Sequence, residues 1–408
     1  MDIRPADPGV DAMDDVEPGI VVEPRSVEGM AAALKWASAN GLATVVRGAG
    51  TKRDWGRVPP RVDVLLGTRH LNRVLVHRAG DLTVSVEAGI TLDALNRMLS
   101  SHGQCLPLDP PFGDRATIGG LVATNDSGPL RHRFGTPRDL VIGIQLATTD
   151  GRITKAGGQV VKNVAGYDLS KLMSGSFGSL AAITGATFKL APLPGASTTL
   201  QADGIDSATI VRMAAAVGDS QLEQVAFDLH ALRGVERGQA STTCLVRIWS
   251  PAGAIDRQVE ATRALLASAG ANTAVLAGDA DAGRWQQHAQ VLWPGEGAVV
   301  RVSWLPADLA SVLALLESLA AGGAVEMAGR IGVGAGLIRI AGHPSRQAAA
   351  IQQLRSSTPV RHVVVVRAGP EVKAHVDVWG PQPNARLLQS IKAALDPAGI
   401  LGAGRGPL

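Results

Sequence analysis

The sequence predicts an α+β protein with more than one domain. Its 408 residues exceed what a single hydrophobic core usually serves. Patterns typical of helices alternate with β-rich runs along the whole chain, and the 46% of hydrophobic residues is ample for packed cores. The 48 glycines and 23 prolines predict numerous turns between these elements.

The first part of the chain begins with a β-α-β pattern after an N-terminal extension, residues 1–19. We expect a short strand at residues 20–23 and a helix capped by Ser26, which ends at Gly41. That helix places Met30, Ala33, Leu34 and Ala37 on one face. Residues 43–47 and 62–66 are β-branched or leucine-rich and predict two further buried strands.

A hairpin, a helix and a loop-rich segment follow. Residues 73–77 and 82–87 flank an Ala-Gly-Asp turn, and Thr91 begins a helix that carries Leu92, Leu95 and Leu99. Residues 107–138 are dense in glycine, proline, asparagine and aspartate, so we expect ordered loops around a short helix of small residues. Strands are predicted at residues 141–148, 152–155 and 180–190, and residues 193–195 mark the first domain boundary.

Residues 196–380 predict a second α+β region. Its expected helices are residues 207–217, 255–269, 307–320 and 345–356, and its expected strands include residues 243–249, 299–304 and 360–367. The glycine-rich segment 332–336 lies between apolar runs and is typical of a glycine-bearing strand or a hairpin. In residues 381–408 we expect an amphipathic helix, residues 384–395, with Leu387, Leu388, Ile391 and Leu395 on one side.

Charge and motifs exclude several functions. The 39 Lys and Arg nearly balance the 36 Asp and Glu and are scattered, which argues against a nucleic-acid partner. No uncharged apolar run approaches the roughly 18 residues of a membrane span. The acidic N-terminus differs from a secretory signal, so we expect a cytoplasmic protein whose membrane contact is at most peripheral. Cys105 and Cys244 form no metal-ligand pattern, and no metal site is predicted.

The segment VVRGAGTKRDWG, residues 45–56, is the first candidate site. A β-branched strand leads into a loop whose glycines let backbone N–H groups approach an anion such as a pyrophosphate. It lacks the Gly-Lys pair of a phosphate-binding P-loop. After Gly48 and Gly50 the next glycine is Gly56, which does not fit the Rossmann spacing. The alternative is an ordinary glycine turn.

Two further glycine-rich segments are candidates. TIGGLVATN, residues 117–125, would let a flat ring or a ribityl chain lie against Gly119, Gly120 and Ala123; the alternative is a tightly packed helix pair. VVKNVAGYD, residues 160–168, contains the only tyrosine, and the alternative there is a turn capped by Asp168. The sequence has no H-E-x-x-H and no G-x-S-x-G motif, so zincin and α/β-hydrolase chemistry is not supported.

In this order and spacing, these segments resemble the FAD-binding domain of the vanillyl-alcohol oxidase and para-cresol methylhydroxylase (PCMH) superfamily. RGAGTKRDWG, TIGGLVATNDSG, RFGTPRDLVIG, VVKNVAGYDLSKL and GSFGSLAAIT are similar to the FAD-binding subunits of bacterial glycolate oxidases. The resemblance implies a two-subdomain PCMH-type FAD-binding domain at residues 20–195. A smaller α+β cap domain would follow at residues 196–380, and residues 381–408 would return to the FAD domain.

Carried over by position, the resemblance implies that FAD is bound without a covalent link. Its pyrophosphate would lie on the loop that starts at Arg47, where Arg47 or Lys52 would add charge-assisted bonds. The implied cofactor-binding residues are Arg47, Gly48, Ala49, Gly50, Thr51, Lys52, Pro107, Asp109, Thr117, Gly119, Gly120, Ala123, Asn125, Gly128, Gly166 and Ile183.

Three departures from the family pattern bear on function. The C-terminal signature DPAGILGAGR has Gly402 and Ala403 where asparagine and proline are usual. Phe177 stands where catalytic relatives have a glutamate, and the cap lacks the Gly-Asp-Gly-Asn-x-His stretch. No catalytic residue can be assigned from the sequence.

The resemblance therefore implies an FAD-binding subunit of a glycolate oxidase complex that oxidises glycolate, a small 2-hydroxy acid, to glyoxylate. It would relay electrons beside a second FAD-containing subunit and an iron–sulfur subunit. Two alternatives remain: a self-sufficient FAD-dependent 2-hydroxy-acid dehydrogenase, and a scaffold subunit that holds flavin only structurally.

Overall fold

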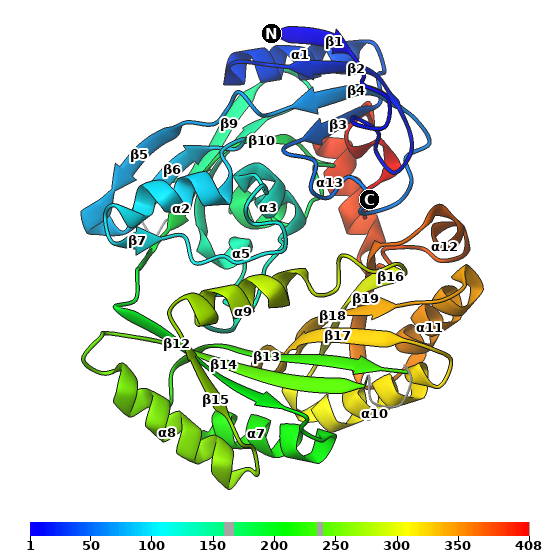
Figure 1. The fold of residues 1–408 in the computed structure, drawn as a ribbon. Helices are drawn as coiled ribbons and strands as arrows, with labels where there is room; N and C mark the ends of the chain where they lie inside the picture. Colours follow the sequence, from blue (N-terminus) through cyan, green and yellow to red (C-terminus); the bar gives the residue numbers. More distant parts are fainter. Residues whose placement is uncertain (159–166, 235–239, 408) are drawn as a thin grey trace. The chain divides into compact units, whose positions relative to one another are not determined.

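The computed structural model describes residues 1–158, 167–234 and 240–407, which fold as two compact units (Figure 1). The first unit comprises Met1–Ser127, Gly135–Leu193 and Pro381–Leu408, and the second comprises Gly128–Phe134 and Pro194–Gly380. Helices and strands are mixed in both units, which confirms the predicted α+β class.

A four-stranded sheet forms one layer of the first unit. Its order is β1 (Asp2–Pro5), β2 (Pro18–Glu23), β4 (Val62–Gly67) and β3 (Thr44–Arg47). The pairs β2–β4 and β3–β4 are parallel, as expected for a β-α-β unit. Residues 1–19 differ from the expected plain extension, because β1 pairs antiparallel with β2 through partners such as Ile3 and Val22.

A five-stranded antiparallel sheet forms the second layer. Its order is β5 (Val74–Arg78), β6 (Thr83–Glu87), β10 (Ala182–Lys189), β8 (Val141–Ala147) and β9 (Ile153–Gly157). Strands β5 and β6 form the predicted hairpin, joined by a short 3-10 turn at Ala79–Asp81. A small two-stranded ladder, β7 (Gln104–Cys105) with β11 (Ala191–Pro192), lies outside this sheet.

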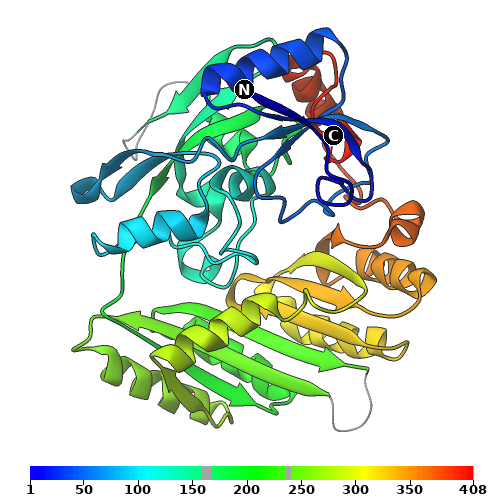
Figure 2. The same ribbon diagram turned by 45° about the horizontal axis from the view of Figure 1, so that its top comes forward.

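Helices cover and separate these sheets (Figures 1 and 2). They are α1 (Val27–Ala39), α2 (Leu92–Ser100), α3 (Ile118–Thr124), α5 (Pro137–Leu140), α6 (Leu169–Met173) and α13 (Ala385–Leu395). The Ser26 hydroxyl accepts a hydrogen bond from the Gly29 N–H at 3.1 Å and so caps α1, as predicted. Leu34 of α1 belongs to one core cluster with Val64 of the first sheet and Ala182 of the second, so α1 joins the two layers.

Helix α13 is less regular in its burial than the sequence suggests. Ile391 and Leu395 pack against the core of the five-stranded sheet, but Leu387 is 61% exposed. The expectation that Leu387 shares the buried side is therefore wrong. Asp396 is the C-cap residue of the helix. Its buried carboxylate accepts hydrogen bonds from Lys392 at 2.5 Å and from the Leu401 N–H at 2.8 Å, and these bonds hold the segment after the helix against the first unit.

An eight-stranded antiparallel sheet forms the centre of the second unit. Its order is β15 (Ala274–Ala277), β12 (Ala196–Asp203), β14 (Ser241–Ser250), β13 (Gln224–Arg233), β17 (Val325–Arg330), β18 (Ala335–Ile340), β16 (Ala298–Trp304) and β19 (Val360–Arg367). Each half is a β-α-β-β-α-β repeat with the same internal strand order, so the sheet is built from two ferredoxin-like modules. Segment 332–336 lies at the turn between β17 and β18, as expected for a hairpin.

The two faces of this sheet are covered differently (Figure 1). The helices of the two modules, which pack on the larger core, are α7 (Ser207–Asp219), α8 (Ile255–Ser268), α10 (Leu309–Ala320) and α11 (Pro344–Ser356). Helix α9 (Asp279–Gln290) lies on the other face, where Trp285 packs against Ala226 and Leu245. Two short helices, α4 (Arg131–Phe134) and α12 (Pro370–His375), complete the unit.

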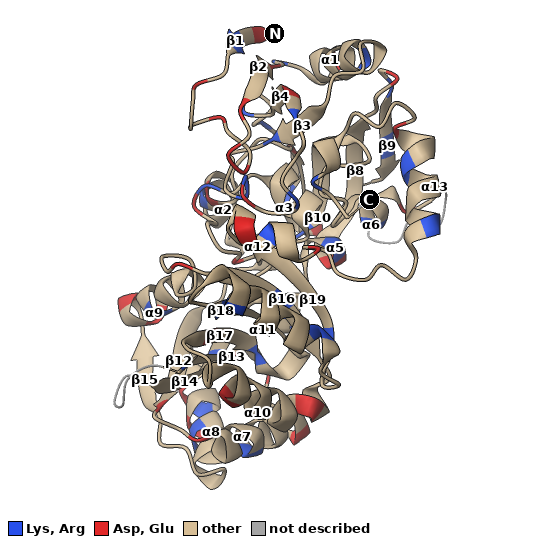
Figure 3. Cartoon of the chain, turned by 90° about the vertical axis from the view of Figure 1, so that its right-hand side faces the viewer, with Lys and Arg blue, Asp and Glu red and all other residues tan. Residues whose placement is uncertain are grey.

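Basic and acidic residues are interspersed on both units (Figure 3). Among the helices that the structure describes, none is both long and apolar enough to cross a membrane. Within the same residues, no group of three or more His, Cys, Asp and Glu side chains could hold a metal ion.

Candidate functional site

The loop that follows β3 is built to leave its backbone N–H groups available. Gly50 and Gly56 have positive φ angles of 74° and 81°, which glycine adopts without strain. The turn is closed by the Trp55 N–H, which donates to the Lys52 carbonyl at 3.2 Å. Among the described residues, no acceptor is present for the N–H groups of residues 48–52. Consecutive free N–H groups of this kind form a concave anion site.

Helix α3 faces this loop and is made of small residues for a packing reason. The Gly119 N–H donates to the Ala88 carbonyl at 2.7 Å, and a Cβ on Gly119 would lie 2.8 Å from the Ala88 side chain. Gly119 therefore lets the helix approach the end of β6. Gly120 and Ala123 are half-buried and line the space between the helix and the loop.

The loop and α3 touch at Gly48 and Thr117. A Cβ on Gly48 would lie only 2.0 Å from the Thr117 Oγ1 and 3.1 Å from its Cβ. The Thr117 hydroxyl is buried and has no hydrogen-bond partner among the described residues. A buried hydroxyl without a partner costs roughly 1–3 kcal/mol, so a ligand that bonds to it would be favoured.

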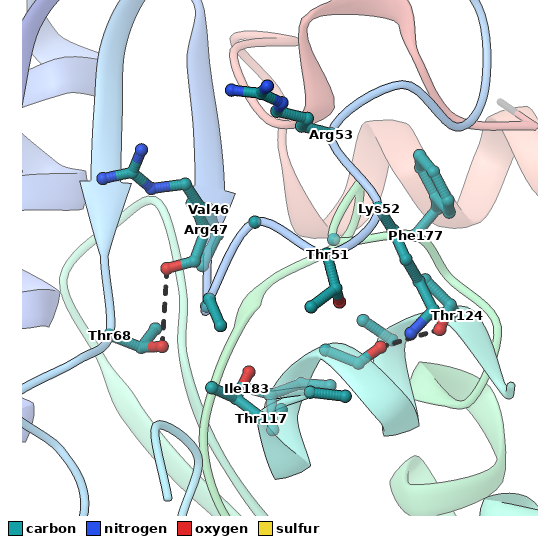
Figure 4. Close-up of a pocket in the computed structure, with 18 of the residues that line it drawn as sticks. Val46, Arg47, Thr51, Lys52, Arg53, Thr68, Thr117, Thr124, Phe177 and Ile183 are labelled. Carbon is teal, nitrogen blue, oxygen red and sulfur yellow. Dashed lines mark hydrogen bonds between the residues drawn. The ribbon is translucent and has the colours of Figure 1, made fainter. Parts of the chain in front are cut away.

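These elements enclose one pocket in the first unit (Figure 4). Its empty space is about 780 Å³, counting solvent at its mouth. Figure 4 shows Thr51 and Lys52 of the loop, Thr117 just before α3, Thr124 of α3 and Ile183 of β10 around this space.

Most of the predicted cofactor-binding residues line this pocket. They are Arg47, Gly48, Ala49, Gly50, Thr51, Lys52, Thr117, Gly119, Gly120, Ala123 and Ile183. The lining also contains residues that are not among the predicted cofactor-binding residues, namely Met13, Val46, Arg53, Thr68, Ala116, Thr124, Phe177, Gly178, Ala181 and Arg405.

The other predicted residues that the structure describes do not line the pocket. Pro107 is buried and Asp109 half-buried in the loop before α3. Asn125 adopts a left-handed conformation, and its Oδ1 accepts from the Arg138 N–H at 3.1 Å, which ties α3 to α5. Gly128 clusters with the second unit. Gly166 lies outside the described residues, as does most of segment 160–168.

The two cations predicted to contact a pyrophosphate directly are already paired with carboxylates. Arg47 Nη1 lies 2.5 Å from Asp11 Oδ1, and Lys52 Nζ lies 3.2 Å from Asp126 Oδ2. Both carboxylates are almost completely buried. Burial raises the pKa of Asp11, but hydrogen bonds from Arg4, the Asp7 amide and Arg47 outweigh it and lower that pKa well below its usual range. Asp11 is therefore an anion that orients Arg47.

The first 13 residues also support the loop. Arg53 Nη1 donates to the carbonyls of Gly9 and Val10, both at 2.9 Å, and Met13 lines the pocket. No signal in the sequence predicted this role, because each contact joins positions about 40 residues apart.

The pocket has the properties that an FAD molecule needs. A Cβ on Gly48 would fill the contact between the loop and α3, the free amides of the loop suit a pyrophosphate, and the Thr117 hydroxyl lacks a partner among the described residues. These features agree with the comparisons to known proteins. Residues 18–157 match the FAD binding domain family.

Curated relatives match the same part of the chain. Glycolate oxidase subunit GlcE of Escherichia coli is 39% identical over 158 residues, which are 38% of this chain and 45% of the relative. Subunit GlcD of Bacillus subtilis is 37% identical over 194 residues, 47% of this chain and 41% of the relative. D-lactate dehydrogenase of Archaeoglobus fulgidus is 36% identical over 173 residues, which are 42% of this chain and 39% of the relative. The chain thus matches less than half the length of each.

Solved structures share the fold over nearly the whole chain. The 6-hydroxy-D-nicotine oxidase of Arthrobacter nicotinovorans aligns over 98% of this chain and 96% of its own with a TM-score of 0.68, at 15% identity. An alkyldihydroxyacetonephosphate synthase aligns over 95% of this chain and 76% of its own, also at 0.68, with 16% identity. These alignments show the fold of the chain, and the family match shows that residues 18–157 form an FAD binding domain.

Proposed function

We propose that the chain is the FAD-binding subunit of a glycolate oxidase complex and relays electrons within it. Its partners would be a second FAD-containing subunit and an iron–sulfur subunit, in the cytoplasm or at the membrane surface through those partners. The similarity to a glycolate oxidase subunit over 158 residues carries this proposal. Bound FAD would supply the hydride and electron chemistry.

The composition of the pocket supports a role centred on the cofactor. Glycine, alanine, threonine and four cations dominate its lining. Two of those cations are paired with Asp11 and Asp126, while Arg53 and Arg405 donate to backbone carbonyls. Such groups bind and orient a cofactor. Oxidation of a 2-hydroxy acid also needs a base for the hydroxyl proton and a free cation for the carboxylate.

One feature of the second unit favours a second candidate, a self-sufficient FAD-dependent 2-hydroxy-acid dehydrogenase. His288 Nε2 lies 2.9 Å from Asp228 Oδ2, and Arg330 Nε lies 3.8 Å from the same oxygen. All three side chains are at least nine-tenths buried. A histidine oriented by a carboxylate and an arginine are the groups that such an oxidation uses. The similarity to a D-lactate dehydrogenase points the same way.

Anaerobic mixing of the purified FAD-loaded chain with excess glycolate or D-lactate distinguishes the two candidates. We expect the flavin absorbance to stay unbleached by the chain alone and to fall when the partner subunits are added. Rapid bleaching by the chain alone would replace the subunit proposal with the dehydrogenase. In that case, Arg330→Met and Arg361→Met, a control at an exposed arginine, would be compared. Loss of bleaching in the Arg330 variant alone would identify Arg330 as the cation that binds the substrate carboxylate. Complex activity that survives removal of flavin from this chain would instead support the scaffold.

The FAD is expected to be released intact when the protein is precipitated with acid. Thr51 occupies the loop position where covalently flavinylated relatives often carry histidine. Cys105 is buried in β7 outside the pocket lining, and burial raises the pKa of its thiol to about 11, which suppresses the reactive thiolate. After precipitation, the yellow colour should remain in the supernatant. Flavin fluorescence that migrates with the denatured polypeptide would contradict this expectation.

A further inference from the structure

A buried arginine holds the pyrophosphate loop from a position about 350 residues away in the sequence. Arg405 is only 5% exposed. Its Nη2 donates to the carbonyls of Arg53 and Trp55, each at 2.7 Å, and approaches the Lys52 carbonyl at 3.3 Å. Its guanidinium carbon lies 5.4 Å from the centre of the Phe177 ring, so the cation is also stacked against an aromatic side chain.

The backbone around Arg405 interlocks with the same loop. The Arg57 N–H donates to the Arg405 carbonyl at 3.1 Å, and the Arg57 side chain donates to the Gly406 carbonyl at 2.8 Å. A Cβ on Gly56 would lie 2.6 Å from the Arg405 carbonyl oxygen and 2.9 Å from the Phe177 ring. The close approach therefore requires glycine at position 56, and the loop is fixed both by side-chain and by backbone contacts.

These contacts act on the half of the loop that closes the anion site. The Lys52 carbonyl accepts both from Arg405 and from the Trp55 N–H, which forms the turn after the free amides. Each carbonyl shares a planar peptide unit with the N–H of the next residue. Fixing the carbonyls of residues 52, 53 and 55 therefore also fixes the direction of the N–H groups that follow them. Burial lowers the pKa of Arg405 to about 10, which still leaves the side chain charged near neutral pH.

We propose that Arg405 is a positioning residue for the FAD pyrophosphate, which it serves by holding the loop of residues 48–56 in its binding conformation. The proposal rests on the FAD site and not on the substrate or the partner subunits. A preorganised loop is ordered during folding, so binding does not carry the entropy cost of ordering it. If the loop loses this order, FAD binds more weakly. The sequence alone gives no indication of which atoms Arg405 contacts.

The test compares three variants by their affinity for FAD, measured by the change in FAD fluorescence on titration of apoprotein. Arg405→Met removes the donors and keeps most of the volume. Arg405→Lys keeps a cation and fewer donors. Arg346→Met is the matched control, because Arg346 in the second unit also donates to three backbone carbonyls, those of Leu319, Gly323 and Ala341. Amide hydrogen exchange of residues 48–56 in the apoprotein reports the loop itself.

We expect Arg405→Met to weaken FAD binding by about tenfold or more, the factor that corresponds to one lost hydrogen bond to a charged group. Arg405→Lys should recover part of that loss, and hydrogen exchange in residues 48–56 should accelerate more in the methionine variant. Arg346→Met should lower the melting temperature but leave FAD affinity within about twofold, a difference of less than about 0.5 kcal/mol, because Arg346 does not line the pocket. An unchanged affinity in Arg405→Met, or an equal loss in Arg346→Met, would overturn the proposal.

Discussion

Gly48→Ala is expected to weaken FAD binding by more than about tenfold, the largest effect of any single methyl group in the pocket. The new Cβ would lie 2.0 Å from the Thr117 Oγ1 and 3.1 Å from the Thr117 Cβ. Rotation of the threonine side chain relieves the first contact but not the second. The loop and α3 must therefore move apart, and both line the pocket. Overpacking of this kind costs about 1–3 kcal/mol of stability.

The measurement is FAD affinity together with the melting temperature of the apoprotein. Gly80→Ala serves as control, because a Cβ on Gly80 meets no atom within 4 Å and the residue lies in the turn between β5 and β6. We expect that control to match the wild type. If Gly48→Ala bound FAD as tightly as the wild type, the contact between the loop and α3 would not set the width of the cofactor site.

The sequence predicted those elements whose local pattern and tertiary packing agree. Helices α1 and α2 begin at Ser26 and Thr91, where side-chain oxygens accept from backbone N–H groups three residues on. Their apolar faces are the buried ones, as in the segment that contains Leu92, Leu95 and Leu99. For such elements, periodicity and capping carry enough information.

Helix α9 was missed because its inward face is not apolar. Its buried side chains are Asp281, Trp285 and His288, and each makes a polar contact with the sheet. Asp281 Oδ1 accepts from Thr199 at 2.5 Å, and Trp285 Nε1 donates to the same hydroxyl at 2.7 Å. A helix that contacts its sheet through hydrogen bonds lacks the periodic apolar residues by which an amphipathic helix is identified in a sequence.

The glycines of the loop were identified from the sequence, but the carboxylates that pair with its cations were not. Glycine spacing indicated that backbone N–H groups would be exposed to a ligand, and the structure places the loop in the pocket wall. The resemblance implied that Arg47 or Lys52 would add charge-assisted bonds to the pyrophosphate, and the structure pairs these cations with Asp11 and Asp126. These pairings depend on tertiary contacts that no local pattern encodes. The same holds for Arg405, whose acceptors are backbone carbonyls. Every residue has a backbone carbonyl, so the residue types do not indicate which of them accept.

Gly50→Val is expected to lower the flavin content of the purified protein severely. Gly50 has a φ of 74°, and a β-branched residue is strained in that region at a cost of roughly 1–3 kcal/mol. The nearest atom to a Cβ there is the Arg47 Cδ at 3.6 Å, so no clash with the protein arises. The effect must come from the backbone conformation and from the side chain that would project from the nest lining the pocket.

Two comparisons separate these causes and control for stability. Gly41→Val introduces the same residue at a φ of 63°, with no atom within 4 Å and outside the pocket lining, so it should lower stability while FAD affinity stays unchanged. Gly50→Asn places a side chain that tolerates the left-handed conformation. If backbone strain is the cause, the asparagine variant should retain most of its flavin; if the cause is volume in the nest, both variants should lose it. A Gly50→Val protein that purifies with full flavin content would show that the pyrophosphate does not lie against this loop.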